Sequence, residues 1–322
     1  MAKAIRDVYG EALAKYGKEN ENVVVLDADV SGSTKSATFG KACPDRFFNM
    51  GIAEANMVAA AGGMASCGKI PFVNTFAVFL TSIGLTAARA LGSYSKLPIK
   101  MAGAYAGMSD AFDGPSHHAL EDIAVMRSLP NFKVLVASDA TQTDWLVKHA
   151  IEDPSPMYLR LSRDVFPDLY AEGEVFEEGK GKVVREGTDV TVIACGILVS
   201  KALAAAEELA KEGISVRVVD MFSIKPLDKE LVVKCAQETG AIVSAEEHSG
   251  IGGLGGAVAE ALCEAGAQVP MAFVGTQDLH GECGPYNNLL AKYGMDAAAV
   301  AKKVREVIAK KYSFLHLQKT GL

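Results

Sequence analysis

The sequence has little tryptophan, no closely spaced cysteines and no surplus of positive charge. Its 322 residues include one Trp and six Cys, and no two cysteines have the C-x-x-C spacing. Widely separated cysteines are not typical of a zinc site or a disulfide framework, so we expect reduced, buried thiols and a cytoplasmic protein. The 39 Asp+Glu outnumber the 32 Lys+Arg and leave a net charge of -7. Because an acidic chain offers no broad basic surface, we expect no nucleic-acid partner.

The sequence also lacks a long uninterrupted apolar run. Residues 70–88 carry no charge, but proline, asparagine, glycine and hydroxyl side chains interrupt them. This pattern favours a buried strand, loop and helix over a span of the bilayer. Met1 leads directly into a helical pattern, with no apolar run behind a basic start, so we expect no secretory signal and no membrane partner.

Short apolar runs alternate with helical stretches along the first half of the chain. The expected strands are residues 23–26, 70–73, 99–102, 133–136 and 157–161. The expected helices are residues 54–65, 79–91, 120–127 and 140–151. Because the strands are continuously apolar, they predict a parallel sheet covered by helices on both faces. The first expected domain, of class α/β, is residues 1–168.

A change of composition separates this domain from a second one. Residues 169–188 are rich in glycine and charge and have no sustained apolar period, so we expect a linker there. The alternation of strands and helices then resumes, which predicts a second domain over residues 189–315. Both domains are expected to be doubly wound, mostly parallel sheets, which bind ligands at the carboxyl ends of their strands.

A glycine-rich run at residues 250–256 satisfies the pattern G-x-G-x-x-G between an expected strand and an expected helix. It follows the third strand of its unit rather than the first, and the nearest acid at the ribose position, Asp278, lies in a loop-like stretch. We therefore favour close packing of a helix N-terminus, or an interface, over a dinucleotide site.

Glu54 is a lone carboxylate among small and apolar residues, in the segment NMGIAEANM. A carboxylate in such surroundings must be paired or carry a raised pKa, because desolvation favours its neutral form. The alternative is a solvent-facing acid at a helix start, which the helix dipole favours. Both interpretations remain open from these residues alone.

Two acids and two imidazoles, Asp110, Asp113, His117 and His118, gather in a turn-rich loop between an expected strand and an expected helix. Loops at such positions often carry polar groups that bind substrate, so the segment is a candidate site. A metal is less favoured, because adjacent histidines point in different directions and no spaced histidine pair recurs elsewhere.

These segments, taken with three others, resemble the C-terminal half of transketolase, and most closely the separate C-terminal subunit of split, two-gene transketolases. The matching stretches are RFFNMGIAE at 46–54, IPFVNTFAVF at 70–79, DGPSH at 113–117, residues 120–131, and LSR at 161–163. They occur in the family's order and spacing. The resemblance implies a pyrimidine-binding domain followed by a transketolase C-terminal domain.

The resemblance also implies thiamine diphosphate as the cofactor. Glu54 falls on the family's glutamate, which would hydrogen-bond N1' of the aminopyrimidine so that the 4'-nitrogen can remove the thiazolium proton. Phe76 and Phe79 fall where the family stacks aromatic rings on the pyrimidine, and Asp29 would lie near the cofactor.

The substrates implied by the resemblance are sugar phosphates of the pentose phosphate pathway. A two-carbon glycolaldehyde unit would pass from a ketose phosphate to an aldose phosphate. Asp113 and His117 would contact the hydroxyls and carbonyl of the sugar, and His117 would act in catalysis. Arg163 and Ser33 would hold the terminal phosphate.

The chain departs from the family at three places. Tyr105 replaces a phosphate-binding histidine, and Ser82 replaces a pyrimidine-pocket tyrosine. The family's Gly-Asp-Gly, followed further along by Asn, is absent, and this motif binds magnesium and the diphosphate. We therefore expect those ligands on a separate N-terminal transketolase subunit, an α2β2 heterotetramer with that partner, and no activity of this chain alone.

Two alternative functions remain. The same layout occurs in the β subunit of 2-oxoacid dehydrogenases and in deoxyxylulose phosphate synthase. A non-catalytic binding or regulatory module could keep the fold as well. The DGPSH loop and the LSR stretch favour transketolase over the first alternative, and the intact Glu54, Phe76, Asp113 and His117 favour an enzyme over the second.

Overall fold

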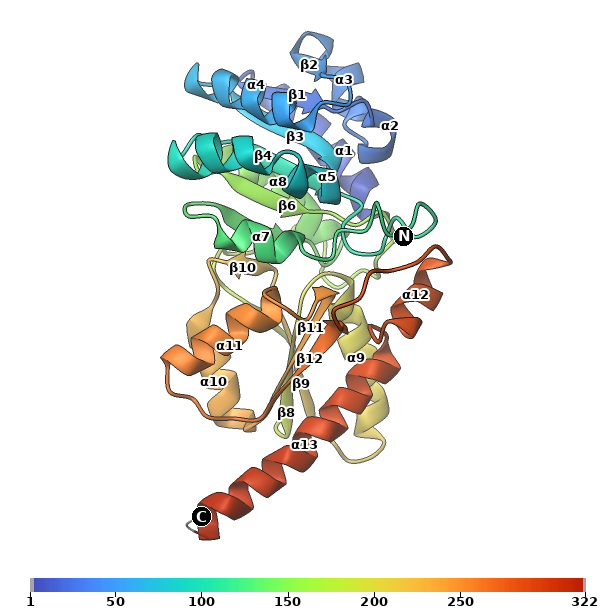
Figure 1. The fold of residues 1–322 in the computed structure, drawn as a ribbon, viewed down its shortest axis with the longest axis vertical. Helices are drawn as coiled ribbons and strands as arrows, with labels where there is room; N and C mark the ends of the chain where they lie inside the picture. The colour runs from blue at the N-terminus through green and yellow to red at the C-terminus, as the bar shows by residue number, and fades with distance from the viewer. Residues whose placement is uncertain (1–2, 321–322) are drawn as a thin grey trace.

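The computed structural model describes residues 3–320 of the chain, with side chains described for residues 3–312. Two sheets, each flanked by helices, lie one above the other along the long axis of the molecule (Figure 1). Both are mostly parallel, so the predicted fold class, α/β with two doubly wound units, is confirmed.

The first sheet has the strand order β10-β5-β6-β4-β3-β1-β2. Its strands are β1 (Val23–Asp27), β2 (Phe47–Asn49), β3 (Ile70–Phe76), β4 (Lys100–Ala104), β5 (Lys133–Val136), β6 (Met157–Arg160) and β10 (Ser223–Lys225). β10 comes from the second half of the chain and pairs antiparallel with β5. All other pairs in this sheet are parallel.

The second sheet has the strand order β12-β11-β8-β9-β7. Its strands are β7 (Lys182–Arg185), β8 (Val190–Ala194), β9 (Val216–Asp220), β11 (Ile242–Ser249) and β12 (Met271–Thr276). β7 pairs antiparallel with β9 and lies within the segment 169–188 that the sequence suggested as a linker. Part of that segment is therefore an edge strand of the second sheet.

Helices cover the sheets on both sides (Figure 1). The α-helices around the first sheet are α1 (Ile5–Glu19), α2 (Ser31–Thr34), α3 (Ala37–Ala42), α4 (Glu54–Ser66), α5 (Ala77–Ser82), α6 (Leu85–Ala87), α7 (Asp122–Ser128) and α8 (Ala140–Glu152). The second unit has α9 (Ile197–Ala210), α10 (Lys229–Thr239), α11 (Leu254–Glu264), α12 (Tyr286–Lys292) and α13 (Ala297–Thr320). The 3-10 turn η1 (Pro44–Arg46) and the π-helical turn η2 (Ala88–Tyr94) complete the elements.

One predicted helix, residues 79–91, is wrong as a single element. The structure has α5, α6 and the π-turn η2 in its place. The hydroxyls of Thr81 and Ser82 donate to the carbonyl oxygens of Ala77 and Val78, at 2.8 and 2.5 Å. Hydroxyl bonds of this kind compete with the regular helical pattern and bend a helix.

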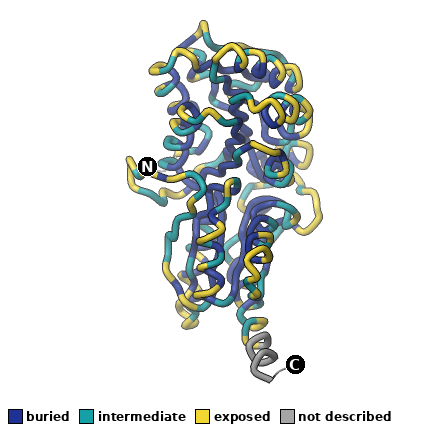
Figure 2. The backbone as a smooth tube through the Cα atoms, turned by 90° about the vertical axis from the view of Figure 1, so that its left-hand side faces the viewer, coloured by how far each residue is buried: buried dark blue, intermediate teal, exposed yellow. Residues whose placement is uncertain are grey.

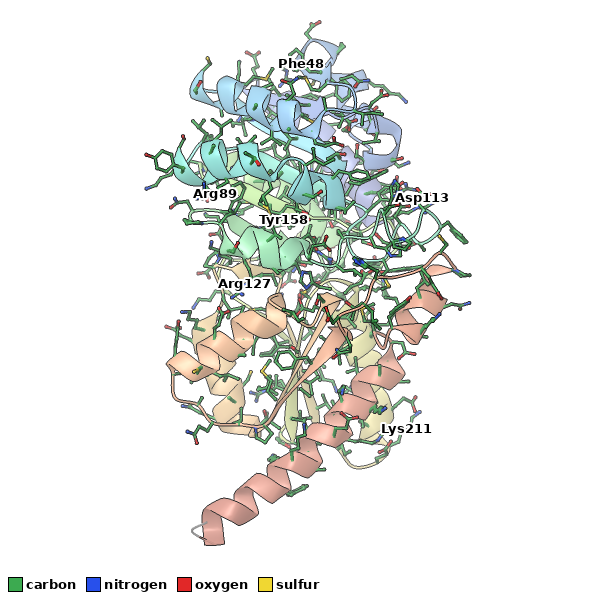
Figure 3. The ribbon with its side chains drawn as sticks, viewed as in Figure 1. Phe48, Arg89, Asp113, Arg127, Tyr158 and Lys211 are labelled. Atoms are coloured by element: carbon green, nitrogen blue, oxygen red, sulfur yellow. The ribbon has the colours of Figure 1, made fainter. Side chains whose placement is uncertain are left out.

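The two units share their interior. Each of the two large apolar clusters draws buried residues from both halves of the chain, and the buried backbone runs through the centre of both units in Figure 2. Arg127 of α7 lies at the junction in Figure 3 and donates to the carbonyl oxygen of Gly252, at 3.1 Å, and to Glu260 of α11. The two units are therefore packed against each other by polar and apolar contacts.

All six cysteines are free, but only Cys43, Cys195 and Cys235 are buried, so the prediction of buried thiols fails for the other three. No helix within residues 3–320 combines the length and the apolar character that crossing a bilayer requires.

Candidate active site

Glu54 begins α4 with its side chain inside the protein. It is 4% exposed, and Thr75 of β3 donates to its carboxylate at 3.3 Å. Among the described residues, Thr75 supplies the one side-chain hydrogen bond to this carboxylate. An acid in the first turn of a helix is favoured by the helix dipole, which offsets part of the cost of burial. The buried carboxylate is consequently free to accept a further hydrogen bond from a ligand.

Four aromatic rings gather at the carboxyl ends of β3 and β4. Phe76 ends β3, Phe79 lies in the first turns of α5, and Tyr105 follows β4. The ring centroid of Phe76 is 4.7 Å from that of Tyr105, and His117 lies 5.8 Å from Phe76 and 5.2 Å from Phe79. These rings form an apolar wall that suits a flat heteroaromatic ligand.

Asp29 and Ser33 lie in the turn after β1 and in the short helix α2. The buried carboxylate of Asp27, which ends β1, accepts hydrogen bonds from the hydroxyls of Thr34 and Ser36, each at 2.8 Å, and so fixes this turn. Asp29 is exposed and has a φ of 67°. Asn49, at the end of β2, donates to its carboxylate at 2.8 Å.

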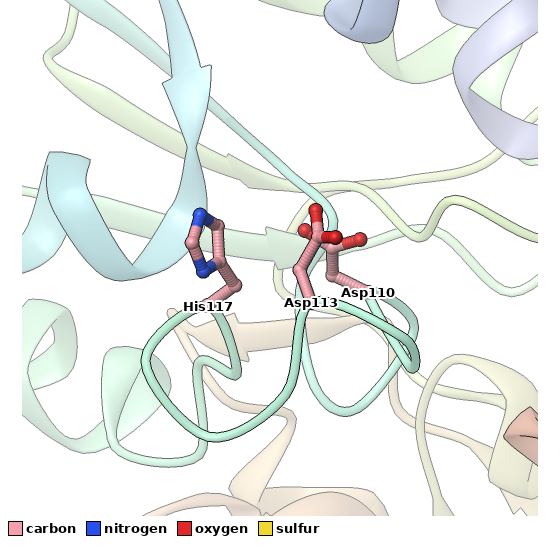
Figure 4. Close-up of side chains that lie close together, drawn as sticks. All are labelled: Asp110, Asp113 and His117. Atoms are coloured by element: carbon pink, nitrogen blue, oxygen red, sulfur yellow. The ribbon is translucent and has the colours of Figure 1, made fainter. Parts of the chain in front are cut away.

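Asp113 and His117 lie in the loop between β4 and α7, hereafter the substrate loop, residues 105–120. Gly114 takes a φ of 79°, and its carbonyl accepts from the backbone N–H of His117 at 2.9 Å, so the loop turns back on itself. Figure 4 shows the carboxylates of Asp110 and Asp113 side by side, with the His117 ring on the other side of the loop. One ligand atom from each of the three lies within 4.8 Å of the others.

A small cavity of about 420 Å³ opens beside the substrate loop and contains two arginines, Arg6 and Arg163. Arg6 of α1 donates to the hydroxyl of Tyr105, and the guanidinium carbons of Arg6 and Arg163 lie 5.3 and 5.4 Å from the Tyr105 ring centre. Arg163 also approaches the carboxylate of Asp110 at 3.6 Å. The two guanidinium groups offer hydrogen-bond donors that suit an anion, and the carboxylates of Asp7 and Asp164 also line the cavity.

The second unit holds the substrate loop in place. The carboxylate of Glu247, in β11, accepts from the backbone N–H of Met108 at 2.6 Å. Burial raises the pKa of Glu247 to about 7, although Arg160 and the Met108 N–H favour its charged form. Gly107 must be glycine, because its φ is 66° and a Cβ there would lie 2.3 Å from the Glu247 Cδ. The backbone N–H of Gly284 donates to the Ala111 carbonyl at 3.0 Å.

The glycine-rich run at 250–256 has an internal partner. The backbone N–H groups of Leu254 and Gly255 donate to the buried carboxylate of Glu246 at 2.7 and 2.8 Å. A Cβ at Gly253 would lie 2.1 Å from that carboxylate. The start of α11 is thus filled by a side chain of the protein, in agreement with the packing interpretation.

The structure brings some of the predicted residues together and leaves others apart. Phe76, Phe79 and His117 form one ring cluster, and Asp113 lies beside Asp110 with a carboxylate oxygen within 4.8 Å of a His117 ring nitrogen. No hydrogen bond or ion pair within residues 3–312 joins Asp29 or Ser33 to the substrate loop or to Arg163. The sequence interpretation missed Arg6 and Glu247. Arg6 occupies one position of an ordinary helical pattern, and Glu247 lies in β11, far along the chain from the motif residues, so neither carries a local signal.

Family models match both units of the chain. The "Transketolase, pyrimidine binding domain" matches residues 1–167, and the "Transketolase, C-terminal domain" matches residues 179–300. A solved structure, "Split gene transketolase, inactive beta4 tetramer", is 48% identical in sequence to this chain and superposes on it with a TM-score of 0.88. The match covers 97% of this chain and 100% of the chain in that structure.

Curated relatives agree with these matches. The "Putative transketolase C-terminal section" of Methanocaldococcus jannaschii is 42% identical over 310 residues, which are 96% of this chain and 97% of the relative. Human transketolase is 40% identical over 312 residues, but these cover 95% of this chain and 49% of the human protein. The chain thus spans about half of a full-length transketolase. On these grounds the chain belongs to the transketolase family of thiamine diphosphate-dependent transferases.

Proposed function

We propose that the chain is the pyrimidine-side subunit of a transketolase that moves a two-carbon glycolaldehyde unit from a ketose phosphate to an aldose phosphate. It acts together with a separate subunit that binds magnesium and the diphosphate of the cofactor. The observation that carries this proposal is the buried carboxylate of Glu54, which has one side-chain partner among the described residues and lies at the start of α4.

The described residues suit the pyrimidine half of thiamine diphosphate. Bound to the enzyme, this cofactor supplies the nucleophilic carbon that takes up and passes on the two-carbon unit. Glu54 would accept a hydrogen bond from the pyrimidine nitrogen, because its carboxylate is buried and has acceptor capacity left. Phe76 and Phe79 would cover the pyrimidine face and exclude water from it, and Asp29 would lie near the cofactor.

The substrate loop would bind the sugar. Asp113 is exposed and His117 half-buried, so both can reach a substrate from the loop. A ring N–H of His117 can donate to the sugar carbonyl oxygen, and that hydrogen bond strengthens as negative charge develops on the oxygen. Arg163, with Ser33 from α2 and the neighbouring Arg6, would hold a terminal phosphate, because guanidinium groups match the geometry of phosphate oxygens.

Three comparisons support a partner subunit. The chain matches a protein named as a C-terminal section over nearly its whole length, and it matches half of human transketolase. The related split-gene structure is described as an inactive β4 tetramer. We infer an α2β2 assembly in which the partner supplies the magnesium ligands, because a cofactor held at one end only would not be positioned for reaction.

The test is an assay of the chain copurified with its native partner. Two-carbon transfer from xylulose 5-phosphate to ribose 5-phosphate should require the partner, thiamine diphosphate and magnesium. Glu54→Gln should nearly abolish turnover, while Glu207→Gln, the same exchange at an exposed glutamate of α9, should have no effect. Thermal melting of both variants checks their folding.

Other outcomes would contradict the proposal. Activity of the chain alone would refute the need for a partner, and full activity of Glu54→Gln would refute the cofactor assignment. Activity with pyruvate and a lipoyl acceptor, but not with pentose phosphates, would identify a 2-oxoacid dehydrogenase subunit. A cofactor-loaded complex that turns over neither type of substrate would favour the non-catalytic module.

A further inference from the structure

Asp110 is a buried acid of the substrate loop that the proposed mechanism does not use. Its residue is 1% exposed, and its Oδ2 atom is buried without a hydrogen-bond partner. Its Oδ1 atom lies 3.6 Å from a guanidinium nitrogen of Arg163. Leaving a buried carboxylate oxygen without a hydrogen-bond partner costs free energy. A buried acid that is kept in this state next to an arginine suited to anions indicates a role in the binding site.

We propose that Asp110 is a specificity-determining residue that competes with the terminal phosphate of the substrate for Arg163. The inference rests on the proposed function, because it takes Arg163 as part of the phosphate site. In its ionised form, Asp110 partly neutralises Arg163 and repels an incoming dianion. In its protonated form, it no longer neutralises the arginine, and Asp164 remains as the other carboxylate that interacts with Arg163.

The surroundings of Asp110 support the competition. Burial and the neighbouring carboxylate of Asp113 both raise the pKa of Asp110, to about 6, while His117 and Arg163 lower it. Two carboxylates side by side favour sharing one proton. The titratable groups that line the adjoining cavity are Arg6, Asp7, Asp164 and Tyr286. His118, Tyr105 and Cys283 are further titratable groups around this part of the loop.

A divalent metal is the other occupant that Asp110, Asp113 and His117 suggest by their spacing. Arg163 argues against it, because its guanidinium already places a positive charge 3.6 Å from Asp110. A second cation there would be repelled.

The competition for Arg163 also gives the site a preference at neutral pH for sugars whose ends carry less charge than a phosphate dianion.

The test measures sulfate binding to the chain by calorimetry. Sulfate remains a dianion between about pH 5 and pH 8, so any pH dependence of its affinity comes from the protein. The arginines and Asp110 all belong to this chain, so the partner subunit and turnover are not needed. Asp110→Asn should bind sulfate about fivefold more tightly than the wild type at pH 8 and equally well at pH 5.

Two variants separate this inference from the proposed function. Asp144→Asn makes the same exchange at a half-exposed aspartate of α8, paired with Lys15 at 3.7 Å, and should leave sulfate affinity unchanged. Arg163→Gln should weaken sulfate binding. Melting curves identify any variant that fails to fold, and Asp110→Ser then replaces Asp110→Asn.

The remaining outcomes overturn the inference in distinguishable ways. Sulfate binding that needs Arg163 but is equal in wild type and Asp110→Asn at pH 8 would refute the competition and leave the phosphate site standing. Sulfate binding that does not change in Arg163→Gln, or is absent in every variant, would refute the phosphate site itself and the inference with it.

Discussion

Glu247 links the stability of the chain to pH in a way that a single substitution can test. Its carboxylate is buried between β11 and the substrate loop and accepts the backbone N–H of Met108 at 2.6 Å. Burial raises the pKa of Glu247 from 4.5 to about 7, so the folded chain holds a proton on this side chain that the unfolded chain has already released. Glu247→Gln removes the titration and keeps an oxygen that can accept from Met108.

The sign and size of the pH dependence of the free energy of unfolding follow from proton linkage. Between pH 4.5 and about 7, folding takes up a proton at Glu247, so the free energy of unfolding falls as the pH rises through this window. A pKa difference of about 2.5, at about 1.36 kcal/mol for each pKa unit, corresponds to an upper value of about 3 kcal/mol. The stability of Glu247→Gln relative to the wild type should therefore increase by up to that amount between about pH 4.5 and pH 8.

Urea denaturation followed by far-UV circular dichroism at several pH values measures this difference. Circular dichroism is a better probe of unfolding here than tryptophan fluorescence. The single tryptophan, Trp145, stacks on the His149 ring with a centroid distance of 4.8 Å, so its fluorescence would also respond to that imidazole. Glu207→Gln is the control for the exchange itself, since this glutamate is exposed. A stability difference between Glu247→Gln and the wild type that stays constant across the pH range would refute the reasoning.

Three further substitutions test the site and its support. His117→Gln should lower turnover of the complex by about 100-fold without weakening thiamine diphosphate binding, and equal losses in both would contradict a role at the substrate. Gly107→Ala should destabilise the chain by about 2 kcal/mol or more in urea, because it combines a φ of 66° with a contact 2.3 Å from Glu247. Arg160→Met should cost about 3–5 kcal/mol, because it removes the guanidinium, 2.7 Å away, from the buried Asp122 and leaves that carboxylate with the Tyr158 hydroxyl; a loss below about 1 kcal/mol would contradict the importance of this ion pair.

Strands and helices with a regular apolar pattern were predictable from the sequence. β1 and β5 begin at the expected residues, because a continuous apolar run with turn residues at both ends favours a buried parallel strand. The helix α4 also begins at the expected residue, Glu54. The aromatic part of the candidate site came from the family resemblance. Phe76 is the last residue of β3 and Phe79 lies in α5, which begins at the next residue, so both rings lie at the carboxyl end of the strand.

Elements without such a pattern were not predictable. The edge strand β7 is half-exposed along its length and lies in a segment rich in charge and glycine, so it resembles a linker. The strand β10 has three residues and joins a sheet formed by the other half of the chain. Its partner, β5, is distant in the sequence, and no local signal reports a long-range antiparallel pair.

The substrate loop shows why the site itself could be predicted only in part. Its motif residues, Asp113 and His117, are local in the sequence, but the contacts that hold the loop come from the second unit, through Glu247 and Gly284. The second unit contributes none of the predicted binding residues, yet it also supplies β10 to the first sheet. The geometry of the substrate loop is therefore a property of both units together. For this reason, residues 1–168 alone would keep the motifs while losing the buried bond from Met108 that positions them.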